Sequence, residues 1–406
     1  MSAAAEERFA RATLCAVAEP GDALLGRLVE RLGPAGAVDA IRTGAAPAGI
    51  VSGERAGLRL AERLESWRIR LGGADPEADR EVADRLGLRL VCPGDTEWPT
   101  TLNDLGHRRP YALWLRGPMD LRFGCLRSVA VVGARAATSY GTRVAAELGA
   151  DLARAGWTVV SGGALGIDAA AHRGALAADG PTVGVFANGV DRPYPSRNDG
   201  LFAEMAERAL LVTESPPGVR PTRLRFLVRN RVIAALSRGT VVVEAEIRSG
   251  ARNTATHARE LGRAVMAVPG PVTSRGSRGC HQLLRDEPPA RCVTSAAEVI
   301  EEVGSIGDDL APRPRGPVLP HDELEPLTRQ VLEAVPARGS AGLAQIAVRA
   351  GVDTATAHGL LGVLAAGGFV ERCGQGWRMP HRPARRGPSG GAEPHPSRSS
   401  GQGVRP

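Results

Sequence analysis

The sequence predicts an α/β protein whose core is a parallel sheet, with a helical domain before the core and a winged-helix domain after it. The first observation is the stretch from Ser128 to Leu176, where two short apolar runs each pass into a loop of small residues and then into a helical pattern. Two successive strand–turn–helix units predict neighbouring parallel strands. The second observation is that four more apolar runs follow before residue 269, with helix-like segments between them. We therefore expect about six parallel strands.

Residues 1–80 predict a small helical domain. Apolar side chains recur at helical spacing between Leu24 and Leu32, and further helices rich in alanine, leucine and arginine follow. We interpret this domain as a packing or interaction module without chemistry of its own. The first residues are too acidic and too poor in apolar side chains for a signal peptide, and no apolar run approaches the ~20 residues of a membrane span. We therefore expect a cytoplasmic protein with no membrane span.

Residues 81–303 are expected to form the core domain. The expected strands are the apolar runs at 129–132, 158–160, 183–186, 210–212, 241–243 and 265–268, after a lead-in strand near 88–91. The carboxyl ends of parallel strands meet at one edge of a sheet, and open sheets of this kind bind ligands there. The loops that follow the strands should therefore gather around one cleft.

Two of these loops are candidates for binding an anion. The first holds Gly133 and Arg135, and the second runs from Ser161 to Asp168 with glycines at 162, 163 and 166. A loop between a strand's carboxyl end and a helix's amino end presents free backbone N–H groups and a partial positive charge, which suits a phosphate. The alternative is that the glycines only permit tight turns. The residues themselves leave both interpretations open.

Ordinary nucleotide, metal and disulfide chemistry is not indicated. No G-x-G-x-x-G follows either strand, and a Walker A loop is impossible because the chain contains no lysine. The six cysteines lie far apart and never form a C-x-x-C pair, so neither a metal site nor a disulfide framework is expected. We expect no cofactor.

The net charge of +7 is concentrated in two places. Residues 218–263 carry ten arginines against three glutamates, and residues 381–406 carry five arginines against one glutamate. In the first of these segments, apolar residues from Val232 to Leu236 predict a buried helix stripe, which would put Arg229, Asn230 and Arg231 in the helix's first turn. Arginine is a fork-shaped donor suited to phosphate, and Asn230 can cap the helix or bond a base or sugar. The alternative is a solvated arginine face.

Phe226 lies one turn before these residues and is positioned to stack on a nucleobase. The motifs VAVVGAR, VVSGGALGIDAAAHRGAL, ANGVDRPYP, TESPPG, RNRVIAALS, VVEAEIRSGARNTATHARELGR and AVPGPV, in this order, resemble the DprA/Smf family of DNA-processing proteins over residues 85–303. The resemblance implies a Rossmann-like core that binds single-stranded DNA and forms a homodimer. It also implies a protein that protects incoming DNA and loads the RecA recombinase during natural transformation.

The resemblance assigns roles to particular positions. It implies a phosphate-binding loop at Gly133 and Arg135, a second cleft loop at 161–168, an RNR motif at 229–231 and an SG turn at Ser249 and Gly250. The expected DNA-binding residues are therefore Gly133, Arg135, Ser161, Gly162, Gly163, Gly166, Phe226, Arg229, Asn230, Arg231, Ser249 and Gly250. The chain departs from the family pattern at Ala134, Leu165 and Leu227, where family members commonly have serine, a basic residue and proline. Each departure removes a polar contact or a rigid turn.

An enzyme is the alternative class of function. Asp168, His172, Glu214 and Glu244 fall near the expected cleft and could supply acid/base chemistry, as in a nucleotide-cleaving phosphoribohydrolase on a similar sheet. The P-G-G-x-G-T signature of those enzymes is absent. Asp168 at a helix start is explained as a helix cap or dipole partner, and His172 as a packing residue. We therefore expect no catalytic residues and no enzymatic activity.

The carboxy-terminal part predicts a linker, a winged helix and a tail. Residues 304–323 are rich in proline and glycine and predict a linker, and 324–380 predict three helices and a hairpin. The third helix, TATAHGLLGVLAA, has no arginine and offers only His358 as a base reader. It favours a protein-docking module, or one that contacts nucleic acid only loosely, over a duplex reader. Residues 381–406 predict a disordered basic tail.

Overall fold

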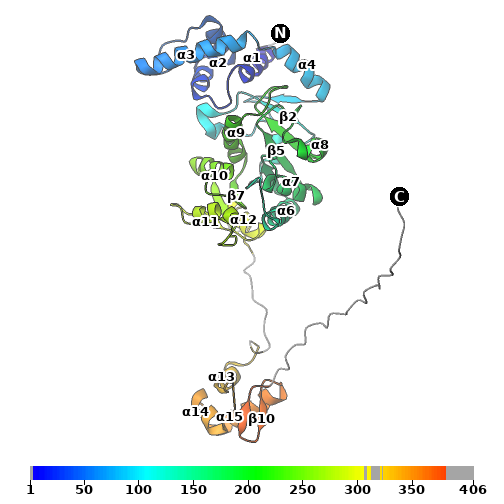
Figure 1. The fold of residues 1–406 in the computed structure, drawn as a ribbon, viewed down its shortest axis with the longest axis vertical. Coiled ribbons are helices and arrows are strands. Elements are labelled where there is room, and N and C mark those ends of the chain that lie inside the picture. Colours follow the sequence, from blue (N-terminus) through cyan, green and yellow to red (C-terminus); the bar gives the residue numbers. More distant parts are fainter. Residues whose placement is uncertain (1–2, 306–308, 312–320, 322, 381–406) are drawn as a thin grey trace, which may run out of the picture. The chain divides into compact units, whose positions relative to one another are not determined.

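The computed structural model describes residues 3–305, 309–311, 321 and 323–380. The chain divides into two compact units, which meet in sequence between residues 312 and 313 (Figure 1). None of the helices in the described segments is both long and apolar enough to cross a membrane. Most of the predicted linker and the whole predicted tail lie outside the described residues.

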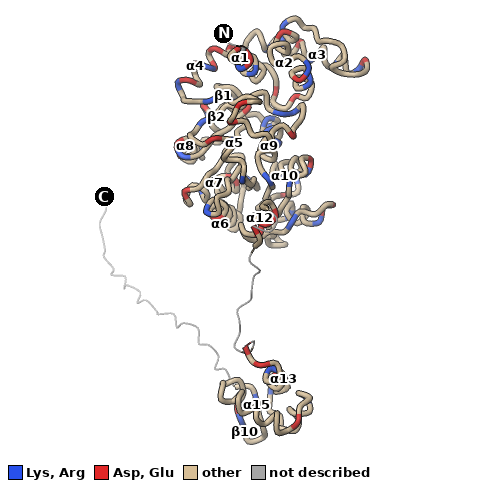
Figure 2. The backbone as a smooth tube through the Cα atoms, turned by 180° about the vertical axis from the view of Figure 1, so that it is seen from behind, with Lys and Arg blue, Asp and Glu red and all other residues tan. Residues whose placement is uncertain are grey.

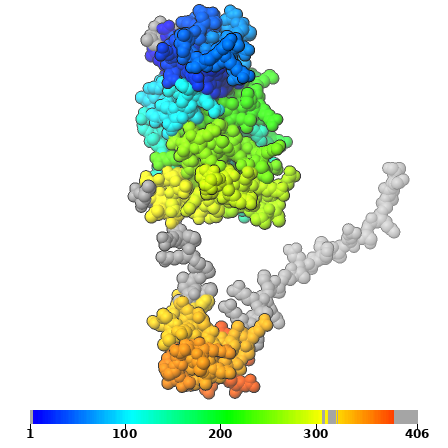
Figure 3. All heavy atoms as spheres, turned by 90° about the vertical axis from the view of Figure 1, so that its left-hand side faces the viewer, coloured from blue at the N-terminus to red at the C-terminus, as the bar shows by residue number. Residues whose placement is uncertain are grey.

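The first unit begins with a helical bundle. Its helices are α1 (Ala3–Val17), α2 (Ala23–Thr43), α3 (Glu54–Leu71) and α4 (Pro76–Leu86). The Asp22 carboxylate caps α2 by accepting a hydrogen bond from Leu24 N at 3.0 Å. Leu25 and Leu28 from the predicted stripe are fully buried in the same cluster as Trp67. In Figure 3 these helices (blue) pack directly against the cyan and green atoms of the core.

The core holds a nine-stranded sheet in the order β1-β2-β6-β5-β4-β3-β7-β8-β9. The strands are β1 (Arg89–Val91), β2 (Leu113–Arg116), β3 (Ser128–Val132), β4 (Thr158–Ser161), β5 (Thr182–Phe186), β6 (Leu210–Thr213), β7 (Gly239–Val242), β8 (Ala264–Ala267) and β9 (Arg291–Cys292). Strands β3 to β9 run parallel, and β1 and β2 add an antiparallel edge next to β6. The six predicted parallel strands are confirmed, whereas β2 and β9 were not predicted.

Both faces of the sheet are covered, which explains why its strands are continuous apolar runs. The remaining helices of this unit are η1 (Thr100–Arg108), α5 (Leu121–Gly124), α6 (Ser139–Arg154), α7 (Ile167–Ala177), η2 (Ser196–Asn198), α8 (Asp199–Arg208), α9 (Arg223–Leu236), α10 (Gly250–Glu260), η3 (Arg275–Ser277), α11 (Arg278–Leu283) and α12 (Ala296–Val303). Along β3, Val129 and Val131 pack with α6, α7 and α12, and Ala130 and Val132 pack with α9 and α10. The alternation places α9 and α10 on one face of the sheet and α6, α7 and α12 on the other.

The position of α9 corrects one expectation. The helix begins at Arg223, where Thr222 Oγ1 accepts a hydrogen bond from Arg225 N at 3.3 Å. Residues 229–231 therefore lie in the middle of α9, and the prediction that they form its first turn was wrong. The apolar stripe does not mark the first turn, because Arg223 and Leu224 are exposed and Arg225 and Phe226 are only half-buried.

The second unit has the predicted winged-helix architecture. Its elements are α13 (Pro326–Ala334), α14 (Leu343–Ala350), α15 (Thr354–Ala366), β10 (Glu371–Cys373) and β11 (Gly376–Arg378). Ile346, Leu361 and Trp377 share one buried cluster, and β10 pairs antiparallel with β11. Asp353 caps α15 by accepting a hydrogen bond from Thr356 N at 2.8 Å.

Candidate nucleic-acid interface

A cleft of about 1350 Å³ opens beyond the carboxyl ends of β3 and β7. Strands β4, β5 and β6 follow β3 to one side, and the chain then crosses to β7 on the other side. The carboxyl edge at such a reversal is where open α/β sheets bind ligands. Of the predicted DNA-binding residues, those that line this cleft are Gly133, Arg135, Phe226, Arg229, Asn230, Ser249 and Gly250.

The second predicted loop supports the cleft from within the protein. Ser161 is fully buried, and its hydroxyl donates to Val131 O at 2.6 Å. A Cβ on Gly162 would lie 2.4 Å from Arg229 Nη2, so this glycine admits the arginine. Gly163 and Gly166 have φ of 67° and 82°, the left-handed region that favours glycine. The tight-turn interpretation therefore applies here, while Ala164 and Asp168 of the same segment reach the cleft lining.

The amino ends of α6 and α7 already hold carboxylates of the chain itself. The buried Glu244 carboxylate accepts hydrogen bonds from Thr138 N at 2.9 Å and Thr138 Oγ1 at 2.6 Å, beside the first turn of α6. Asp168 Oδ2 in α7 accepts from Gly162 N at 3.2 Å and from Ala164 N at 3.4 Å. Burial raises the pKa of Asp168, and Arg229 beside it opposes that shift. The N–H groups of Thr138, Gly162 and Ala164 are therefore already bonded to carboxylates of the chain, whereas the expectation that Gly133 and Arg135 bind phosphate stays a prediction.

Arginine side chains supply hydrogen-bond donors at the cleft that no carboxylate of the described chain occupies. Arg135, Arg223, Arg248 and Arg275 are exposed and line the cleft, and none of them forms an ion pair within the described part of the chain. In Figure 2 blue segments lie along α9 and α10, the helices that border the cleft. Guanidinium groups bind phosphate as bidentate forks, so the lining suits an extended polyanion.

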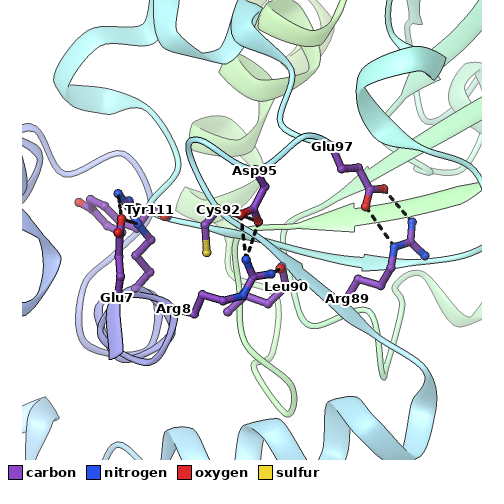
Figure 4. A network of polar contacts seen from close by, with 9 residues as sticks. Glu7, Arg8, Arg89, Leu90, Cys92, Asp95, Glu97 and Tyr111 are labelled. Carbon is purple, nitrogen blue, oxygen red and sulfur yellow. Dashed lines mark hydrogen bonds and ion pairs between the residues drawn. The ribbon is translucent and has the colours of Figure 1, made fainter. Parts of the chain in front are cut away.

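Some arginines elsewhere in the first unit form ion pairs with carboxylates. Where the amino-terminal bundle meets the sheet, Arg8 contacts Asp95 at 2.8 Å and Arg89 contacts Glu97 at 2.8 Å (Figure 4).

Sequence reasoning missed Arg248 and Arg275 as cleft residues. They lie in the segments that follow β7 and β8, so a search for positive charge throughout the connections after predicted strands would have found them.

Arg229 and Asn230 connect elements of the cleft wall. Arg229 is 6% exposed and donates from Nη1 to Gly162 O at 3.0 Å and to Val185 O. Burial lowers the pKa of Arg229 to about 10, and Asp168 opposes that shift. Asn230 Nδ2 donates to Gly250 O at 3.2 Å, which ties α9 to α10. Arg229 therefore presents little of its guanidinium group to a ligand.

Arg231 lies outside the cleft lining. Its side chain is fully buried and forms a bidentate pair with Glu214, with Nη1 to Oε1 at 2.8 Å and Nη2 to Oε2 at 2.7 Å. Gly21 of the amino-terminal bundle covers it so closely that a Cβ there would lie 2.7 Å from Arg231 Nε. The expectation that Arg231 contacts DNA is therefore corrected: the arginine joins the bundle to the core.

Three features surround the Phe226 ring in the cleft. The guanidinium carbon of Arg135 lies 4.9 Å from the ring centroid, and that of Arg229 lies 5.9 Å from it. The Tyr194 ring centroid is 6.0 Å from that of Phe226, with the rings inclined at 51°. Tyr194 lines the cleft and was not among the predicted residues. Its signal in the sequence is the PYP segment soon after β5.

Ser249 and Gly250 form the start of α10 at the cleft. Ser249 occupies the N-cap position, but its side chain makes no capping hydrogen bond. Its hydroxyl has no partner among the described residues, and a Cβ on Gly250 would meet open space.

The four candidate acid/base residues each have a structural partner. Glu244 accepts hydrogen bonds from Thr138, the N-cap residue of α6, Glu214 pairs with Arg231, and Asp168 bonds the loop after β4. His172 is fully buried, with Nδ1 2.7 Å from Thr182 Oγ1, and burial lowers its pKa to about 3. These contacts explain all four residues without a chemical role.

Comparisons with known proteins agree with the predicted resemblance. Residues 89–304 match the model of the family described as DNA recombination-mediator protein A, and residues 329–374 match the IclR helix-turn-helix domain. A DNA processing protein DprA of Mycobacterium tuberculosis is 46% identical over 380 residues, which cover 91% of this chain and 93% of that protein. The DprA of Bacillus subtilis is 35% identical over 217 residues, covering 53% of this chain and 72% of that one.

A solved structure supports the same assignment. The X-ray structure of DNA processing protein A from Streptococcus pneumoniae superposes with a TM-score of 0.52 and 32% sequence identity, covering 61% of this chain and 86% of that chain. The likeness supports the Rossmann-like fold of the core, and the IclR match covers the winged helix. The chain belongs to the DNA recombination-mediator protein A family, the DprA/Smf family whose motifs it carries.

Proposed function

We propose that this protein binds single-stranded DNA in the cleft beyond β3 and β7. The observation that carries the proposal is the set of four exposed arginines without carboxylate partners in the described chain, all lining one cleft. Phosphate contacts from arginine supply sequence-independent affinity. DNA is the polyanion that we propose as the ligand, because the similar proteins are named DNA processing protein.

The second unit supplies little for reading a duplex. Reading the major groove needs side chains that donate to or accept from base edges. The exposed positions of α15 include Thr354, His358, Gly359 and Val363, and none of the helix's residues is an arginine. We therefore assign DNA binding to the first unit and a protein-docking role to the winged helix.

The family also suggests what the bound strand is used for. The description of the family as a recombination mediator supports a protein that protects incoming single strands and passes them to the RecA recombinase. We propose that it does so in the cytoplasm, as a homodimer, and without catalysis of its own. The structural partners of Asp168, His172, Glu214 and Glu244 support a non-enzymatic role.

Fluorescence anisotropy tests the proposed ligand. We expect a labelled single strand to bind more tightly than a duplex of the same sequence, and a mononucleotide to bind weakly. Affinity for the single strand should fall steeply with salt, since counterions are released from each contacted phosphate. Equal affinity for duplex and single strand would contradict the proposal. Tight binding of a mononucleotide with release of its base would establish the nucleotide-cleaving alternative instead.

Removing residues 313–406 should leave single-strand binding in place. The boundary separates two compact units, so the first unit should fold alone. The removed tail at 381–406 carries five arginines and one glutamate, so a modest loss of affinity is expected at low salt and should vanish near physiological salt. Binding curves of both forms at about 50 and 150 mM salt measure this. Loss of binding at both concentrations would place DNA recognition in the second unit.

A further inference from the structure

Tyr194 is an exposed aromatic side chain at the edge of the cleft. It is 45% exposed, whereas Trp67, Trp157 and Phe202 are at most 1% exposed. Within the described chain, the aromatic residues that line the cleft are Tyr194 and Phe226. An aromatic ring left open to water beside four exposed arginines is the arrangement that single-strand binders use to stack bases next to bound phosphates.

Phe226 is less available than Tyr194 for stacking. Its ring is partly buried and has the guanidinium groups of Arg135 and Arg229 and the ring of Tyr194 as neighbours. These contacts make Phe226 a support that holds both Arg135 and Tyr194 in the cleft. The free aromatic surface is therefore that of Tyr194.

Polar contacts restrain the loop that carries Tyr194. Asn188 is fully buried, and its Nδ2 donates to Arg192 O at 2.6 Å. The Asp191 carboxylate accepts a hydrogen bond from Gly218 N at 3.0 Å, which joins this loop to the loop after β6. A ring presented by a restrained loop loses little conformational freedom when a ligand binds.

We propose that Tyr194 stacks on one unpaired nucleobase of the strand whose phosphate contacts Arg135, and that this stacking sets the preference for single strands over duplex. The proposal rests on the proposed function and deepens it. Arginines bind the phosphates of either form, but bases within a duplex already stack on each other and cannot reach a side ring. Because every base has a π-face, the preference does not depend on sequence.

The test compares Tyr194→Leu, Tyr194→Phe and wild type in the full-length chain. Tyr194→Leu should lower single-strand affinity by about 5- to 150-fold and leave duplex affinity and the salt slope unchanged. Tyr194→Phe should retain wild-type affinity, because it keeps the ring. Phe123→Leu, which alters an aromatic residue that is 69% exposed and absent from the cleft lining, is the matched control and should change nothing.

An oligonucleotide with abasic sites provides a second measurement. Wild type and Tyr194→Leu should bind the abasic strand equally, because it offers no base to stack on. Equal losses on normal and abasic strands, a parallel loss on duplex, or no effect of Tyr194→Leu would overturn the stacking proposal. If Tyr194→Leu has no effect but wild-type affinity depends steeply on salt, the proposal that single strands bind in this cleft would stand. Absence of single-strand binding by the wild type would overturn both.

Discussion

Replacing Arg231 with alanine should lower the free energy of unfolding of the first unit by about 3–5 kcal/mol. The arginine is fully buried and Glu214 is almost so, and their two hydrogen bonds compensate for the loss of water around both charges. Removing the guanidinium group leaves a buried carboxylate without its partner, which is costly. Urea titration followed by tryptophan fluorescence measures the loss, since four of the five tryptophans lie in residues 3–305.

Two further variants separate the buried pair from a general effect of losing an arginine. Arg154→Ala removes an ion pair with Asp151 in which both side chains are more than half exposed, and it should change the free energy of unfolding by at most about 0.5 kcal/mol. The double replacement Arg231→Met with Glu214→Leu should recover much of the loss, because a well-packed apolar pair needs no charge compensation. A small effect of Arg231→Ala would show that water reaches Glu214 in solution.

Replacing Arg135 with alanine should weaken single-strand binding about 10- to 100-fold at low salt, equally for every sequence. Arg135 is exposed, has no ion-pair partner among the described residues, and lies beside Phe226 at the cleft. Loss of one phosphate contact should reduce the slope of log affinity against log salt by about 0.7. Salt titrations by anisotropy measure both quantities, with Arg154→Ala as the control arginine distant from the cleft lining. A loss that depends on sequence would indicate base readout instead.

Arg229 should behave differently from Arg135, although both arginines were expected from the sequence to contact phosphate. Arg229 is buried and its guanidinium group donates to Gly162 O and Val185 O beside Asp168. Its replacement removes those bonds and leaves buried acceptors unsatisfied, so the main consequence is lower stability. The difference between the two residues comes from burial, which their common charge does not reveal.

The amino-acid sequence by itself determined the six parallel strands from β3 to β8 and the winged helix. Each depends on local periodicity: β3 and β4 are apolar runs that end in small residues, and α6 and α7 follow with helical spacing. The edge strand β2 and the short strand β9 were not predicted. β9 has two residues, both exposed, so it leaves no apolar run in the sequence.

Only the tertiary structure decided which residues face the cleft. Arg231 is buried because Glu214 and Gly21, both distant in sequence, close around it. Glu244 follows β7 in the sequence, yet its carboxylate accepts hydrogen bonds from Thr138, the N-cap residue of the distant helix α6. Arg248 and Tyr194 line the same cleft from separate loops. Charge and hydrophobicity are properties of a residue, but exposure and pairing depend on which distant segments the fold brings beside it, and no local pattern encodes that.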